Sequence, residues 1–279
     1  MVKLEKTLDW EIAQNPIYNL NNNIIPGYKE IRKVGASTNQ LLSVMKTSYY
    51  PIKIESFKKI IDTISRETDM ELAGYNEFRN GKVITAQLKS NNPFLIGGST
   101  IEGYLTIGTG FDGSQSFFIG HTSEYLRCAN QFGRIIKNYV SRLTKSNTQR
   151  IDQILSELIH YNHYEKELYS SFERMTKIKV DSKITRDCIE RLVGLSQEEK
   201  LDNSLITKST GIKLVTLRDS ILREYKDLGE NAFGLFNGIT HYTTHKMETR
   251  TPDVFGNILT SKAKINNMGY ELITKELVV

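Results

Sequence analysis

The histidines are the residues whose spacing most resembles a metal site. His160 and His163 are three residues apart, and His241 and His245 are four apart. Either spacing can present two imidazoles on one helix face to the same metal ion. The second pair lacks the glutamate of a zinc-protease motif, and no third ligand lies nearby in the sequence. We therefore expect ordinary surface or core histidines, with no metal site and no cofactor.

Other reactive residue types also fall short of a catalytic motif. Asp112, His121 and Ser114 or Ser123 are the types found in hydrolytic triads, but the sequence has no Gly-x-Ser-x-Gly elbow. Residues 97–100, Gly-Gly-Ser-Thr, lack the Gly-Lys-Ser/Thr ending of a phosphate-binding loop. The sequence therefore predicts no catalytic residue, which favours a binding protein over an enzyme.

A strong local charge asymmetry lies between residues 124 and 150, which contain six basic residues and one acid, Glu124. On a helix from Thr122 or Ser123 to about Thr144, the basic residues gather opposite an apolar side. A solvated helix face is the alternative, but such faces usually mix both signs. A stripe of one sign neutralises phosphates and releases counterions. We predict that five residues bind nucleic acid: Arg127, Arg134, Lys137, Arg142 and Lys145.

Aromatic residues beside this segment could stack on unpaired bases. Phe117 and Phe118 are neighbours in a predicted strand, so their side chains point to opposite faces. We therefore expect one of the two rings to be exposed or covered by another subunit. Phe111 and Phe118 are the predicted stacking residues.

Two hairpins are the elements that must position these residues. Met70–Phe78 and Lys82–Leu88 flank Asn80-Gly81, a strong hairpin signal because both turn residues tolerate positive φ. Glu102–Gly108 and Gln115–Gly120 flank a second turn that contains Asp112-Gly113. Together they predict an antiparallel β-meander of about four strands, covered by the long amphipathic helix.

The whole pattern predicts an α+β fold with a mainly helical C-terminal half. We expect an N-terminal arm over 1–27, a sheet-plus-helix core over 28–150 and a helical region over 151–279 packed on the core. The finer elements are a short helix at Leu8–Gln14, extended segments at 28–34 and 41–49, a helix at 57–66 capped by Ser56, helices at 151–175, 182–192, 213–228 and 231–247, and a polar loop at 194–211.

Composition sets the remaining limits. The chain has 279 residues, 39% of them hydrophobic, and a formal net charge of +5, which permits an anionic partner. No stretch approaches the roughly 18 consecutive apolar residues that cross a bilayer, and the N-terminus lacks a signal-peptide pattern. We expect a cytoplasmic protein without membrane contact, whose two cysteines, Cys128 and Cys188, are reduced.

Three stretches resemble motifs of the phage- and plasmid-borne family catalogued as domain of unknown function 932. They are Gly108-Thr-Gly-Phe-Asp-Gly-Ser-Gln-Ser, Tyr125-Leu-Arg-Cys-Ala-Asn130 and Gly234-Leu-Phe-Asn-Gly-Ile-Thr-His-Tyr-Thr-Thr-His245, and the resemblance covers about residues 28–275. The sequence departs from the family pattern at Phe111 and Leu126. The matching positions are Asp112, Gly113, Ser114, Arg127, Cys128, Asn130, Asn237, Thr240, Tyr242 and His245.

The resemblance implies a role in phage or plasmid DNA metabolism. The order of two hairpins and a helix is also similar to single-strand annealing proteins of the Red-beta and RecT kind, where sheet and helix build an oligomeric groove. We predict a phage-encoded protein that binds single-stranded DNA, self-associates in the bacterial cytoplasm and promotes annealing or recombination without ATP. One alternative is a phage structural or host-interaction protein without DNA affinity. Another is a metal-dependent enzyme acting on nucleic acid or a nucleotide through His241, His245 and Asp112.

Overall fold

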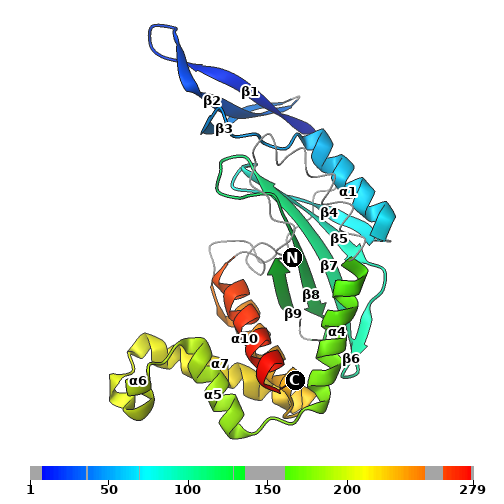
Figure 1. The fold of residues 1–279 in the computed structure, drawn as a ribbon, viewed down its shortest axis with the longest axis vertical. Helices are drawn as coiled ribbons and strands as arrows, with labels where there is room; N and C mark the ends of the chain where they lie inside the picture. Colours follow the sequence, from blue (N-terminus) through cyan, green and yellow to red (C-terminus); the bar gives the residue numbers. More distant parts are fainter. Residues whose placement is uncertain are drawn as a thin grey trace. The chain divides into compact units, whose positions relative to one another are not determined.

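The computed structural model describes residues 8–35, 37–68, 70–127, 129–135, 161–248 and 260–277. The fold is α+β, with strands in the N-terminal half and mainly helices in the C-terminal half (Figure 1). The chain divides into two compact units. Unit 1 comprises residues 1–91, 104–121 and 135–162, and unit 2 comprises residues 92–103, 122–134 and 163–279.

A three-stranded antiparallel sheet opens unit 1, in the order β1 (Trp10–Tyr18), β2 (Ile24–Gly35) and β3 (Thr38–Lys46). The extended segments expected after residue 28 lie largely within β2 and β3. The helix expected at 8–14 is wrong, because this segment pairs with β2 from Trp10 opposite Gly35 to Asn15 opposite Glu30. Long-range pairing has overridden a short local pattern.

The second sheet has the strand order β4-β5-β7-β8-β9, and β6 pairs with β7. The bounds are β4 Met70–Phe78, β5 Val83–Ser90, β6 Phe94–Ile96, β7 Ser99–Gly110, β8 Phe118–Tyr125 and β9 Asn130–Ile135. Both predicted hairpins are confirmed, β4–β5 and β7–β8. The first turn contains Asn80 and Gly81 at φ of 57° and 81°, the positive values that this dipeptide was expected to supply.

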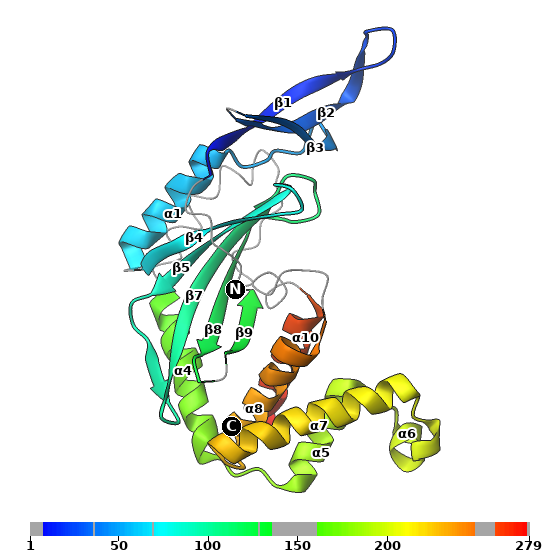
Figure 2. The same ribbon diagram turned by 180° about the vertical axis from the view of Figure 1, so that it is seen from behind.

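Helix α1 (Ile54–Thr68) covers the apolar face of this sheet within unit 1 (Figure 2). It buries Phe57, which contacts the ring of Tyr75 on β4 at a centroid distance of 6.4 Å. The predicted helix is confirmed, but it begins at Ile54, so Ser56 lies in its first turn and does not cap it. The isoleucines that share the helix face with Phe57 are Ile54, Ile60, Ile61 and Ile64.

The long amphipathic helix expected from residue 122 or 123 is wrong over the residues that the structure describes there. Strand β8 continues to Tyr125, Ala129 adopts a positive φ of 51°, and β9 begins at Asn130. Tyr125 and Phe132 are buried as expected, but in strands. A few apolar residues satisfy a strand period and a helix period equally well. Residues 136–144 of the expected helix lie outside the described residues.

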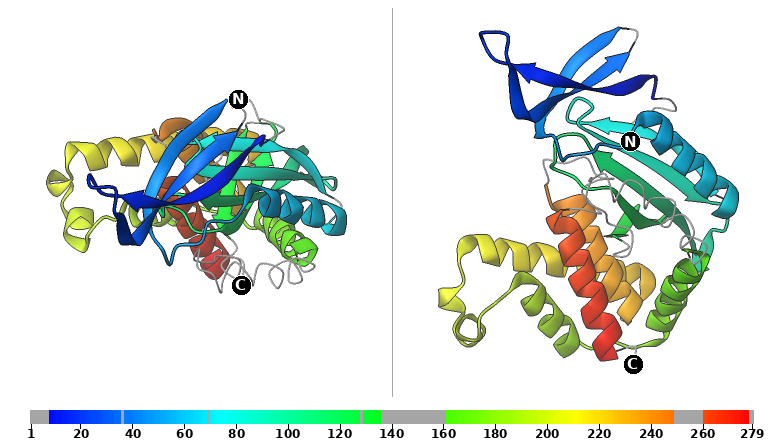
Figure 3. Two further views of the ribbon diagram at one scale, coloured as in Figure 1. Left: turned by 90° about the horizontal axis from the view of Figure 1, so that it is seen from above. Right: turned by 45° about the horizontal axis from the view of Figure 1, so that its top comes forward.

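Helix α4 is the first described helix after β9, and the other helices of unit 2 come after it in the chain (Figure 3). A π-helical turn at Tyr242–Lys246 follows α8. The loop expected at 194–211 is wrong over much of its length, because a capping box of Ser196 and Glu199 starts α6 there and α7 begins at Lys208. None of the described helices has the length and apolarity needed to cross a membrane. Their bounds are α4 Tyr161–Lys177, α5 Ser182–Val193, α6 Gln197–Leu201, α7 Lys208–Leu228, α8 Ala232–His241 and α10 Ser261–Leu277, with a 3-10 turn at Asn203–Leu205.

An aromatic cluster joins β9 to the helices of unit 2. The ring centroid of Phe132 lies 5.1 Å from that of Phe236 on α8 and 5.4 Å from that of Tyr270 on α10. Phe172 on α4 stacks on Phe236 at 5.5 Å. These contacts hold β9, which begins at Asn130, against α8, the helix that carries most of the third family-like motif.

Candidate functional site

One face of the second sheet is polar within unit 1, although its strands are buried. Directly opposed residues on antiparallel strands share a face, and so do alternate residues of one strand. Asn76 opposes Thr85, Gln87 opposes Thr106, and Lys89 opposes Tyr104. We call these six residues the polar face. The opposite, apolar face contains Tyr75, Ile84, Ala86, Leu88, Leu105 and Ile107, with Thr109 opposite Ile84.

Three polar groups on this face are buried without a hydrogen-bond partner among the described residues. They are Asn76 Nδ2, Thr85 Oγ1 and Thr106 Oγ1, and the two threonines are fully buried. A buried donor or acceptor without a partner costs about 1–3 kcal/mol. Such groups are rare in native proteins and call for an explanation, for example a ligand that satisfies them. The polar face is therefore the candidate binding site of unit 1.

The accessibility of the polar face changes along its length. Lys89 and Tyr104 are half-buried, whereas the groups near Thr85 are inaccessible to solvent. Next to Thr85, the ring of Phe118 occupies the space beside Gly108, since a Cβ at Gly108 would lie 2.4 Å from that ring. Gly108 thus lets Phe118 lie close against the sheet.

The predicted stacking residues are not exposed. Phe111 and Phe118 are fully buried, and so is Phe117, which contradicts the expectation that one ring of the 117–118 pair faces solvent or another subunit. Phe111 packs edge-on against Trp10 at 5.7 Å within unit 1. The expectation failed because it assumed an open sheet face, whereas residues 83–88 of β5 are buried on both faces.

The predicted phosphate-binding residues do not form a helical stripe in the described part of the chain. Arg127 is exposed and forms an ion pair with Asp227 at 3.5 Å, a surface contact generally worth less than about 1 kcal/mol. Arg134 lies in β9. The remaining three residues, Lys137, Arg142 and Lys145, lie outside the described residues.

The first family-like motif, Asp112-Gly113-Ser114, forms a turn in unit 1. The Asp112 carboxylate accepts a hydrogen bond from the Ser114 amide at 3.0 Å, and Arg79 donates to Ser114 Oγ at 2.7 Å. Arg79 also pairs with Asp112 at 3.4 Å. Gly113 has a φ of +74°, and a Cβ there would lie 2.8 Å from Met45. These contacts give the motif a structural role in shaping the turn.

Four residues from the other two motifs meet in unit 2. Asn130 Nδ2 donates to the Asn237 carbonyl at 3.3 Å, and His245 Nε2 donates to Asn130 Oδ1 at 3.2 Å. Thr240 Oγ1 donates to the same Asn237 carbonyl at 3.0 Å. A cavity of about 20 Å³, the size of one water molecule, lies beside Asn130, Asn237 and Thr240. The arrangement ties β9 to α8 and explains why these motif positions belong together.

The two histidines of the third motif, His241 and His245, have different environments. The rings of His241 and His245 lie 4.8 Å apart, and His245 is exposed. His241 is buried with its Nδ1 unpaired among the described residues, and burial lowers its pKa to about 4, with His245 contributing. The pair forms part of no group of three histidine, cysteine or acidic ligands in the described ranges. Tyr242 is also buried.

The two cysteines differ in what can be described. Cys188 is buried in α5, and burial raises the pKa of its thiol to about 12, so the thiol is protonated and inert at neutral pH. Cys128, a position of the second motif, lies outside the described residues.

Residues 41–265 match the family described as Domain of unknown function (DUF932). This range includes all three stretches that resemble the family motifs. No curated protein and no solved structure gave a significant match to the chain.

Proposed function

The chain belongs to the DUF932 family over residues 41–265, and we propose that it binds single-stranded DNA through the polar face of unit 1. The proposal is based on the buried polar groups of Asn76, Thr85 and Thr106, which have no hydrogen-bond partner in the described part of the chain. Asparagine, glutamine and threonine hydrogen-bond to base edges. Bases of a single strand leave these edges unpaired, whereas those of a duplex pair with each other.

Three residues beside these groups supply the other contacts that a single strand needs. Phe118 lies next to Thr85 and stacks on a base once its ring turns outward. Lys89 and Tyr104 are cross-strand partners at the more accessible end of the polar face. There the Lys89 ammonium would contact a phosphate, and the Tyr104 ring would stack on a base. In this proposal Phe118 keeps its expected role, but it is covered in the free protein.

Binding at this face requires local opening, because Thr85 and Thr106 are fully buried. A conformational change before or during binding lowers the association rate constant below that of a preformed site. We therefore expect slow association and, once the buried groups are paired, slow dissociation. The remaining basic residues, Arg127, Arg134, Lys137, Arg142 and Lys145, stay in the proposal as phosphate contacts.

The more specific proposal is that binding promotes annealing or recombination in phage or plasmid DNA metabolism, without ATP. The resemblance to mobile-element proteins supports this role, and the sequence lacks a phosphate-binding loop. Annealing needs many nucleotides held together, which favours a homo-oligomer.

Binding of a fluorescent single-stranded oligonucleotide across a salt series, with duplex DNA as competitor, tests the proposal. We expect preference for the single strand and an affinity that falls linearly with salt on logarithmic axes. Absence of binding at low salt would refute it and favour a structural or host-interaction protein. Stoichiometric metal in the purified protein, with destabilisation by a chelator, would favour the metal-dependent enzyme.

A further inference from the structure

The three-stranded sheet of unit 1 exposes large apolar side chains on one of its faces. The strand register places Tyr28 opposite Lys46, Glu30 opposite Val44, Arg32 opposite Leu41 and Val34 opposite Asn39. Opposed and alternate residues share a face, so the exposed apolar residues form one surface. We call this surface the outer face; its apolar members are Tyr28 (47% exposed), Val34 (36%), Leu41 (45%) and Val44 (53%).

The other face of the same sheet supplies the core contacts within unit 1. Ile31 and Leu42 are buried there. Ser43 donates from Oγ to the Phe111 carbonyl at 2.6 Å, and Lys33 forms an ion pair with Glu77. The outer face is therefore not part of the unit's own core. A monomeric soluble protein rarely exposes a contiguous apolar patch larger than a few hundred Å² unless the patch binds something.

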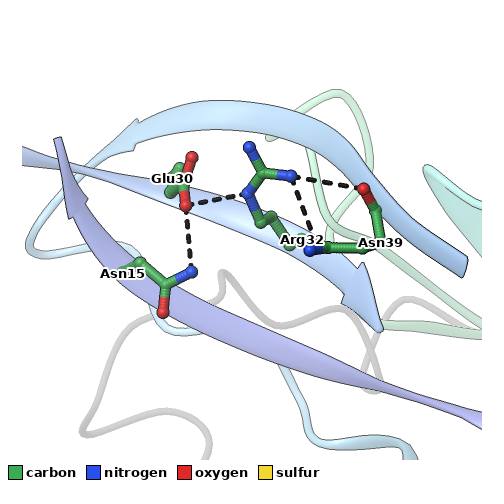
Figure 4. A network of polar contacts seen from close by, with 4 residues as sticks. All are labelled: Asn15, Glu30, Arg32 and Asn39. Atoms are coloured by element: carbon green, nitrogen blue, oxygen red, sulfur yellow. Dashed lines mark hydrogen bonds and ion pairs between the residues drawn. The ribbon is translucent and has the colours of Figure 1, made fainter. Parts of the chain in front are cut away.

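The polar residues of the outer face neutralise one another (Figure 4). Glu30 accepts from Arg32 at 2.8 Å and from Asn15 at 2.9 Å, and Arg32 also donates to Asn39 Oδ1 at 3.2 Å. The two remaining charges on this face, Glu11 and Lys46, have opposite signs. The face thus has no net charge. A nucleic acid or an anionic membrane selects a basic surface, which this face does not provide.

We infer that the outer face binds the outer face of a second copy of this chain. A two-fold contact brings the same surface together from both copies, so a neutral, apolar face is complementary to itself. Four apolar side chains at about half exposure offer roughly 300 Å² per copy, and the polar network and hairpin tip extend this toward the ~800 Å² of a standard interface. Two such sheets would pack face to face at about 10 Å. This inference does not rest on the proposed function.

Sedimentation velocity of the full chain across micromolar concentrations tests the inference. We expect a concentration-dependent species with the mass of two chains. Val44→Lys and Tyr28→Ser should each raise its dissociation constant at least tenfold, because each variant removes apolar area at the contact. Ile212→Lys is the matched control, since Ile212 is 58% exposed on α7 in unit 2 and is not part of the outer face, so it should leave the dissociation constant unchanged.

Far-UV circular dichroism establishes that each variant is folded, and Tyr28→Ser adds a readout that does not depend on an introduced charge. A wild-type chain that stays monomeric throughout, or a dimer that both outer-face variants leave intact, would overturn the inference. A monomer that instead binds neutral lipid vesicles or another protein through this face would overturn it as well. A single-stranded DNA titration of the same samples separates this result from that of the proposed function.

Discussion

Replacing the buried threonines of the polar face by valine should stabilise the free protein. Valine has the shape of threonine but no hydroxyl, so Thr85→Val and Thr106→Val remove groups that have no hydrogen-bond partner among the described residues without opening a cavity. An unpaired buried hydroxyl costs about 1–3 kcal/mol. We expect each variant to raise the free energy of unfolding by about 1 kcal/mol, and the pair by about 2 kcal/mol. For a chain of this size, each 1 kcal/mol corresponds to roughly 2–4 °C in Tm.

Urea unfolding monitored by circular dichroism measures this change, and two other threonines serve as controls. Thr109→Val removes an equally buried, unpaired hydroxyl from the apolar face and should stabilise similarly. Thr68→Val removes a hydroxyl that donates to the Ile64 carbonyl at 2.6 Å, so it should not stabilise. If Thr85→Val and Thr106→Val each destabilise by about 1 kcal/mol or more, the hydroxyls have partners in solution and the reasoning is refuted.

The other predictions concern packing, protonation and the motif cluster. Gly108→Ala should cost about 1–3 kcal/mol, because its Cβ would collide with the Phe118 ring; an unchanged midpoint in urea would place the ring elsewhere. His121 is fully buried, and burial lowers its pKa to about 3, whereas the unfolded value is about 6.5. The unfolded chain therefore takes up the proton first, so stability falls from about pH 6.5 downward, by up to about 1.4 kcal/mol per pH unit. His121→Gln should flatten that slope in unfolding curves measured at several pH values, and an unchanged slope would argue against a buried neutral imidazole. Asn130→Ala should destabilise by about 1–3 kcal/mol, since it leaves the buried Asn237 carbonyl with one donor fewer; thermal unfolding would show this, and an equal Tm would contradict it.

Local signals that agree with tertiary structure were predictable from the sequence. The Asn80-Gly81 turn has positive φ values in the structure as its residue types require, and the strands on either side pair as expected. The helix around Phe57 was predictable because its apolar residues repeat at helical spacing and all pack on one sheet face. The Ser196–Glu199 capping box is also a local signal in the sequence, but the prediction of a loop at 194–211 overlooked it.

Elements that depend on distant partners were not predictable. The turn between β8 and β9 has no Gly or Asn to mark it, and Ala129 takes the positive φ instead. The polar face did leave a signal, since Thr85, Gln87 and Lys89 alternate with apolar residues in a predicted strand. That alternation is typical of one solvent-facing side. The burial of these residues, and hence their unpaired hydroxyls, emerges only once the strands are assembled.

The affinity of the Thr85→Val/Thr106→Val double variant for a single-stranded oligonucleotide tests the central claim most directly. Two lost hydrogen bonds at about 0.5–1.5 kcal/mol each should weaken binding roughly 5- to 150-fold relative to the wild-type chain. Thr109→Val, the same change on the opposite face, should bind like the wild-type chain. Wild-type affinity in the double variant, or an equal loss in Thr109→Val, would contradict the assignment of single-stranded DNA to the polar face.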